Sequence, residues 1–128
     1  MRREIVVTPD PIEGLQRLGS HPDTGETGAI VHFSGLVRGT EEGERIGGIH
    51  YEAFEAMVRR QFGLILDEIE TKWPITGVRV THRVGWVRVG EASIWVEVQA
   101  SHRAEAFAAA QFLVDEMKKR VPIWKKPG

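Results

Sequence analysis

Ser101–Lys125, SHRAEAFAAAQFLVDEMKKRVPIWK, is the stretch of sequence that decides the fold. No glycine or proline interrupts it before Pro122, and Ser101 is a residue type that often caps a helix N-terminus. Proline cannot continue a helix, and it pushes the preceding residue toward extended geometry. The pattern therefore predicts a long helix over 102–121, followed by an extended segment.

This helix has one apolar face and one charged face when its residues are spaced at about 100°. The expected apolar residues are Ala106, Phe107, Ala110, Leu113, Val114 and Met117. Lys118 falls at the edge of that face, whereas Lys119 lies among the charged residues. A partly desolvated ammonium has a lowered pKa and is a candidate acid, base or nucleophile. The alternative is that Lys118 lays its methylenes on the core and keeps its ammonium in water.

Both ends of the helix carry candidate binding residues. Free backbone N–H groups at its start, together with His102 and Arg103, form a candidate phosphate or carboxylate site. An ordinary capped helix with surface charges is the alternative there. Beyond the other end, Trp124 is followed by Lys125 and Lys126, which is typical of either an anchored segment or a plain basic tail.

Composition limits the function classes. The 128 residues are enough for one domain with a core of its own, and the net charge of −1 argues against a general nucleic-acid binder. The absence of cysteine excludes disulfides, thiolate metal sites and cysteine nucleophiles, and the five histidines show no close metal-ligand spacing. No apolar run reaches the ~18 residues of a membrane span, and the first residues lack the apolar core of a signal peptide, so we expect a cytoplasmic protein.

The remaining periodicity predicts strands and helices in irregular order. We expect a strand over 3–8, a short helix over 11–18, a central strand over 28–37, a strand over 46–54, a helix over 55–72, and strands over 78–84 and 92–100. Segments 39–44 and 85–91 are expected to be loops. This order favours an α+β fold with a mainly antiparallel sheet packed against two long helices.

Arg38 follows the 28–37 strand directly, where the chain enters a charged, glycine-containing loop. Ligand contacts are common at such positions, although an isolated arginine there is often structural or solvated. No GxGxxG, P-loop or HExxH motif is present. The residues alone thus predict an α+β domain with a candidate anion site and one unusually placed lysine.

Five segments, in this order and spacing, resemble the large, catalytic subunit of molybdopterin synthase. They are Gly28–Arg38, His50–Phe54, His82–Gly85, Ser101–Arg103 and Lys118–Lys125. The resemblance implies an α/β-hammerhead fold and a homodimer at the centre of a heterotetramer. A small ubiquitin-like sulfur-carrier subunit of molybdopterin synthase would dock on each copy.

The family converts cyclic pyranopterin monophosphate (precursor Z) to molybdopterin by inserting two sulfurs as a dithiolene. The sulfur comes from a thiocarboxylate at the C-terminal glycine of the small subunit. A chain without cysteine fits this chemistry, because it must receive sulfur from outside. Molybdenum belongs to a later step, so the resemblance implies no metal and no cofactor.

The resemblance also implies roles for single residues. Lys118 and Lys125 match the catalytic lysines, and the substrate-contacting positions are Leu36, Val37, Arg38, His102, Arg103 and Lys126. Arginines and a helix N-terminus can hold the cyclic phosphate. The two lysines can protonate a leaving oxygen or polarise the thiocarboxylate carbonyl, and a desolvated Lys118 could act as base or transient nucleophile. How these roles divide between the lysines stays open.

Helix geometry separates these candidates into two groups. At ~1.5 Å rise per residue, Arg103 and Lys118 lie more than ~20 Å apart along one helix. We therefore predict that His102 and Arg103 of one subunit complete the site that contains Arg38, Lys118 and Lys125 of the other.

The sequence departs from the family at its end, because members usually continue well past the second lysine whereas Gly128 is the last residue here. We expect either a dispensable tail or a less enclosed substrate site, and we expect the acidic segment 41–44 to lie outside the site.

Two other interpretations stay open. A noncatalytic anion-binding or assembly module would not need Lys118. A nucleic-acid module using Trp124, Lys125 and Lys126 would bind with steep salt dependence.

Overall fold

The computed structural model describes residues 1–15 and 25–128. The helices are α1 (Ile12–Leu15), α2 (Glu55–Lys72) and α3 (Arg103–Arg120). The strands are β1 (Arg2–Thr8), β2 (Ala29–Leu36), β3 (Thr40–Glu41), β4 (Glu44–Arg45), β5 (Gly48–Ala53), β6 (Ile75–Arg83), β7 (Gly85–Arg88), β8 (Ala92–Ala100) and β9 (Ile123–Pro127). None of the helices in this described part is long and apolar enough to cross a membrane.

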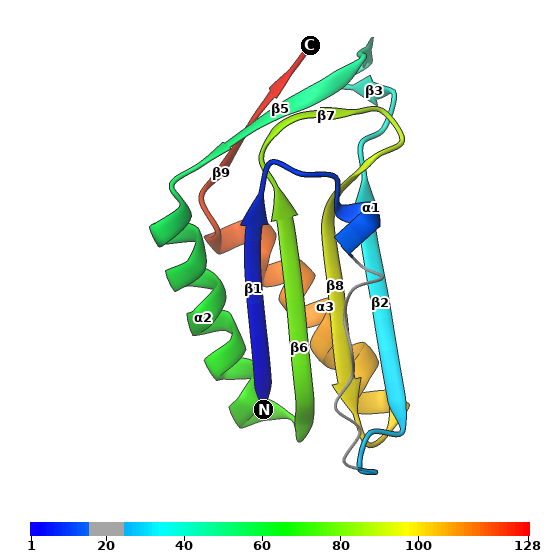
Figure 1. Cartoon of the computed structure of the whole chain (residues 1–128), viewed down its shortest axis with the longest axis vertical. Helices are drawn as coiled ribbons and strands as arrows, with labels where there is room; N and C mark the ends of the chain where they lie inside the picture. The colour runs from blue at the N-terminus through cyan, green and yellow to red at the C-terminus, as the bar shows by residue number, and fades with distance from the viewer. Residues whose placement is uncertain (16–24) are drawn as a thin grey trace.

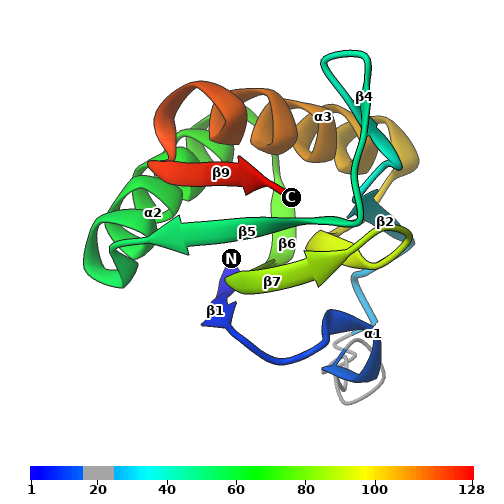
Figure 2. The ribbon, with the colours of Figure 1, turned by 90° about the horizontal axis from the view of Figure 1, so that it is seen from above.

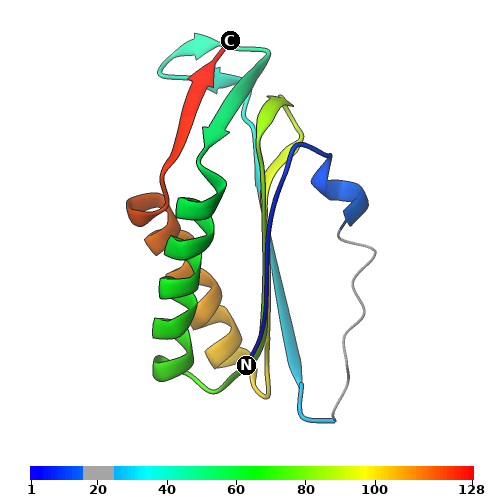
Figure 3. The same ribbon diagram turned by 60° about the vertical axis from the view of Figure 1, so that its left-hand side comes forward.

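The larger sheet has four strands in the order β1-β6-β8-β2. β1 runs parallel to β6, and the other two pairs are antiparallel. Helices α2 and α3 lie side by side on one face of this sheet, and the short α1 lies on the other face (Figures 1 and 3). The predicted α+β fold, with a mainly antiparallel sheet and two long helices, is confirmed.

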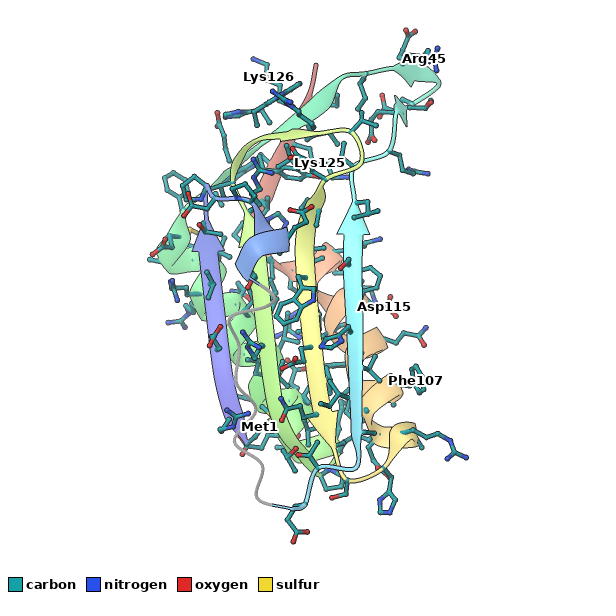
Figure 4. All side chains as sticks on the ribbon, turned by 45° about the vertical axis from the view of Figure 1, so that its right-hand side comes forward. Met1, Arg45, Phe107, Asp115, Lys125 and Lys126 are labelled. Atoms are coloured by element: carbon teal, nitrogen blue, oxygen red, sulfur yellow. The ribbon has the colours of Figure 1, made fainter. Side chains whose placement is uncertain are left out.

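The main core lies between the two long helices and the larger sheet. Three alanines, Ala106, Ala109 and Ala110, are buried on α3 and let its backbone approach the sheet closely. Leu113 is fully buried as predicted. Phe107 is 62% exposed, so its place on the apolar face was wrong: the buried stripe is centred on the alanines, and Figure 4 shows Phe107 on the outer side of α3, beyond β2.

The smaller sheet has three strands in the order β7-β5-β9 and crosses the end of the larger sheet (Figure 2). The segment after Pro122 is therefore a strand, and its Trp124 packs edge-on against Phe54 with ring centroids 5.8 Å apart. This confirms an anchored segment over a plain basic tail. β7 likewise lies inside 85–91, which was expected to be only a loop.

The expected loop 39–44 forms part of a β-hairpin, in which β3 and β4 are paired. Its two turn residues, Glu42 with φ 51° and Gly43 with φ 81°, both have left-handed backbone conformations. This combination is typical of the tight turns whose twist matches antiparallel strands. The prediction of a loop over the whole of 39–44 was therefore wrong.

Three further details concern β2, the start of α3 and the bounds of α1. Among residues 1–15 and 25–128, β2 pairs only with β8 and lies at the edge of the sheet, so its expected central position was wrong. The N-cap of α3 is His102 and not Ser101, and its side chain makes no capping hydrogen bond. The Ser101 hydroxyl donates to the Glu26 carbonyl oxygen at 2.9 Å instead of capping the helix. α1 begins at Ile12, and its predicted extension to residue 18 lies outside the described residues.

Candidate active site

A cavity of about 710 Å³ lies where the end of the larger sheet meets the smaller sheet. Its walls come from the residues that leave β2, from the C-terminal half of α3, and from β5, β6, β8 and β9. This volume is within the range of cavities that bind small organic ligands. Of the eight predicted site residues, five line it: Leu36, Val37, Arg38, Lys118 and Lys125.

Lys118 and Lys125 reach the same cavity because the chain turns sharply after α3. The N–H of Val121, the C-cap residue, donates to the Met117 carbonyl at 3.0 Å, and Pro122 prevents a further helical turn. β9 then runs back antiparallel to β5, which carries Lys125 toward the last turn of α3. Lys118 is exposed in this chain, which favours the alternative that its methylenes lie on the core and its ammonium stays in water.

The segment Leu36–Arg38 forms another part of the cavity wall. Val37 is buried in a small core with Ile49, and its N–H and carbonyl bond to Glu91 and Gly90 of the β7–β8 turn. These two hydrogen bonds fix the direction in which the chain leaves β2. Leu36 and Arg38, on either side, are exposed at the rim of the cavity.

The charge of the cavity favours an anionic ligand. Among the described residues, three cationic side chains line it, Arg38, Lys118 and Lys125, against one carboxylate, Glu41. Glu41 belongs to the acidic segment that was expected to lie outside the site, and it is the residue of that segment that lines the cavity. Guanidinium and ammonium groups converging on a partly enclosed space are suited to a phosphate or a carboxylate.

Three predicted residues lie elsewhere. His102 and Arg103 are exposed at the N-terminal end of α3, and neither lines the cavity. Lys126 follows Lys125 on β9, where successive side chains point to opposite faces, so it lies on the outer face of the smaller sheet (Figure 4). A single chain therefore brings together only part of the predicted site, and the roles of these three residues stay predictions.

Two buried aromatic residues in the cavity wall had no role in the sequence analysis. His82 is 5% exposed and Tyr51 is 5% exposed, and their rings meet edge-on with centroids 5.4 Å apart. Burial chiefly, and secondarily the charge of Lys125, lowers the pKa of His82 to about 4, against the opposing effect of a hydrogen bond to the Arg83 carbonyl. Burial also raises the pKa of Tyr51, which exceeds the opposing effect of the nearby Ser93 hydroxyl.

Both rings are thus neutral at physiological pH beside a cationic pocket. The sequence signal that could have identified His82 as a site residue is its place in His82–Gly85, one of the segments that resemble the family. A histidine at the end of a strand is equally typical of a core residue, so this signal alone did not identify it.

An α+β domain with two lysines and an arginine around one cavity has the arrangement of a site for a small anionic ligand. The chain belongs to the MoaE protein family, whose model matches residues 7–120. The molybdopterin synthase catalytic subunit of Thermoplasma volcanium is 38% identical over 117 residues, covering 91% of this chain and 82% of that protein. The Escherichia coli protein of the same name is 34% identical over 123 residues, covering 96% and 82%.

The solved structures agree with the sequence comparisons. The crystal structure of molybdopterin synthase from Staphylococcus aureus has a TM-score of 0.82 and 32% identity, covering 98% of this chain and 89% of that one.

Proposed function

We propose that residues 1–128 form one domain, the catalytic subunit of molybdopterin synthase. It converts cyclic pyranopterin monophosphate to molybdopterin by inserting two sulfurs delivered by a small sulfur-carrier subunit. The observation that carries the proposal is the meeting of Lys118, Lys125 and Arg38 at one cavity, in a chain of this family. A pterin monophosphate is a small anion of the size and charge that such a cavity suits.

The chemistry assigned to each residue follows from its group. Arg38 offers a fork of N–H donors to the phosphate, and the exposed Leu36 beside it offers apolar contact to the pterin. Lys118 and Lys125 are proton donors placed to neutralise oxygen as it leaves and sulfur adds. Val37 supports the wall from its buried position.

The sulfur donor has to come from another chain, because this one contains no cysteine. A thiocarboxylate at the flexible C-terminus of a small subunit is suited to enter the cavity, where the same lysines would polarise its carbonyl. The exposure of Lys118 supports this, since an ammonium in open solvent is accessible to an incoming chain.

The homodimer is part of the proposal, and the edge position of β2 supports it. β2 starts beside Ser101, since the Gly28 N–H donates to the Ala100 carbonyl at 2.9 Å, and it ends just before Arg38. A two-fold axis at this edge would pair β2 antiparallel with its copy and bring the start of one strand beside the end of the other. His102 and Arg103 would then approach Arg38 of the second copy.

The apolar residues exposed along this edge fit the same arrangement. Phe33 is 38% exposed, Leu36 57% and Phe107 62%. The open edge of a strand, flanked by apolar side chains, is a common association surface. A cytoplasmic location belongs to the same proposal and is tested by cell fractionation.

The experiment is conversion of purified precursor Z with thiocarboxylated small subunit, with molybdopterin measured as product. We expect product only when this chain is present, and none when the small subunit carries an ordinary carboxylate. A folded chain that binds the small subunit yet forms no product would contradict the proposal.

A further inference from the structure

The His82 ring is held in one orientation and one tautomer. It lies at the end of β6, and its Nδ1 is 2.8 Å from the Arg83 carbonyl oxygen. A carbonyl oxygen only accepts hydrogen bonds, so Nδ1 carries the proton. Because burial keeps the ring neutral, Nε2 is left with an unprotonated lone pair.

The Nε2 atom has no partner yet. Within the described residues it makes no hydrogen bond, although His82 lines the cavity. Nδ1 is committed to the backbone and the ring edge is packed against Tyr51, so Nε2 is the one polar atom that His82 can offer to the cavity. A fixed acceptor in the lining of a cationic cavity is suited to receive an N–H donor.

Lys125 is the complementary group. Its Cα pairs directly with that of Tyr51 between β9 and β5, so both side chains lie on the same face of the smaller sheet. In the described part of the chain, its ammonium forms no hydrogen bond or ion pair, although it is close enough to act on the ring of His82. Arg38, Lys118 and Glu41 are the other charged groups that line the cavity.

We propose that His82 Nε2 accepts a hydrogen bond from the Lys125 ammonium and holds it toward the cavity, which makes His82 a positioning residue for the reaction. The inference deepens the proposed function and rests on it for its catalytic consequence. Lysine has a flexible four-carbon stem, and an exposed one samples many rotamers. A neutral acceptor that is fixed by the backbone limits the rotamers of Lys125 and leaves its positive charge in place. A carboxylate would limit the rotamers too, but it would neutralise that charge.

Two substitutions separate this role from a structural one. His82→Asn keeps a donor near Nδ1 for the Arg83 carbonyl but has no atom at Nε2, whereas His82→Gln places its amide near Nε2 and loses the Nδ1 donor. We expect kcat of His82→Asn to fall roughly 10- to 100-fold with little change in KM or Tm, and His82→Gln to retain more activity. The opposite order, with Asn the more active, would overturn the proposal.

A double variant tests the coupling to Lys125. If His82 acts through Lys125, then His82→Asn should cost little further activity in a Lys125→Ala background. If the losses from the two substitutions multiply instead, and His82→Asn raises KM, then His82 contacts the substrate directly. That result would contradict the positioning role.

An NMR measurement tests the contact without any assay of activity. Nitrogen-15 shifts of the His82 ring should show the Nδ1–H tautomer, and the pKa of His82 should rise in Lys125→Met because a nearby cation is removed. Lys126→Met, on the opposite face of the same strand, is the matched control and should change it much less. An unchanged pKa of His82 in Lys125→Met would overturn the contact. If the pKa of His82 rises as expected but the chain makes no molybdopterin, the contact stands and only the proposed function is contradicted.

Discussion

Tyr51 and Lys125 stand directly opposite each other in the antiparallel pairing of β5 with β9. This register carries a lysine from the C-terminal segment to a cavity whose other walls belong to the larger sheet and α3. Tyr51 is buried there, and its ring packs against His82. The position of Lys125 therefore depends on a buried aromatic residue that is distant in sequence.

Substitution of Tyr51 tests that dependence. Tyr51→Phe keeps the packing and loses only the hydroxyl, so we expect the free energy of unfolding to fall by about 1 kcal/mol. Tyr51→Ala leaves a cavity under β9 and should cost about 3–5 kcal/mol. Urea denaturation measures both. Equal losses would show that the ring does not support the strand.

His82 makes stability depend on pH. Its pKa is lowered from 6.5 to about 4 in the folded chain, so between these values the unfolded chain binds more protons. The free energy of unfolding should therefore rise with pH across this window, by up to about 3 kcal/mol from this residue, and that stability is lost as pH falls toward 4. Urea denaturation at pH 4.5 and pH 7 measures the difference. His82→Gln should reduce it, and an unchanged difference in that variant would contradict the burial of a neutral imidazole.

Mixed dimers test the shared site. Two variant chains are made, one carrying Arg103→Ala and the other Lys118→Ala, and each should be inactive on its own. If each site takes Arg103 from one copy and Lys118 from the other, a mixed dimer contains one intact site, and random mixing restores roughly a quarter of wild-type activity. Mixed dimers that form but remain inactive would place both residues of a site on the same chain.

Gly28 fixes the junction between β2 and α3. A Cβ at this position meets the backbone carbonyl oxygen of Ser101, which cannot move aside as a flexible side chain could. We expect Gly28→Ala to destabilise the chain by about 1–3 kcal/mol. Gly63→Ala in α2 is the control, because its Cβ meets nothing within 4 Å and should stabilise the helix by about 0.5–1 kcal/mol. Thermal unfolding measures both, and similar Tm shifts in the two variants would contradict the steric argument.

The elements that the sequence predicted well are those whose periodicity is local. The helix over 55–72 and the strand over 92–100 have the predicted bounds. A buried face repeats along the helix, and the strand is buried along its whole length. β7 and β9 were missed as strands because they are short. The sequence of β9, IWKKP, shows no alternation of apolar and polar residues, and the segment forms a strand because it pairs with β5. Ser101 was assigned as a cap from its type, but a distant carbonyl uses its hydroxyl.

The residues of the candidate site also divide into those that the sequence indicated and those that it did not. Helix periodicity singled out Lys118, and the end of the 28–37 strand singled out Arg38. The family resemblance added Lys125 as a catalytic residue, and the structure brings all three to the same cavity. His82 and Tyr51 were missed as site residues because their importance depends on burial and on contacts between strands far apart in sequence. Neither property leaves a pattern that distinguishes them from ordinary core residues.

The most direct test of the account is the rate of molybdopterin formation from precursor Z by chains with single lysine substitutions. The comparison uses Lys118→Ala and Lys125→Ala against Lys119→Ala, because Lys119 is exposed, paired with Glu116 at 3.4 Å and outside the cavity. We predict losses of ~100-fold or more for the first two, with folding and binding of the small subunit retained. Lys119→Ala should stay within about twofold of the wild type. Equal rates in all three variants would contradict the assignment of the cavity as the active site.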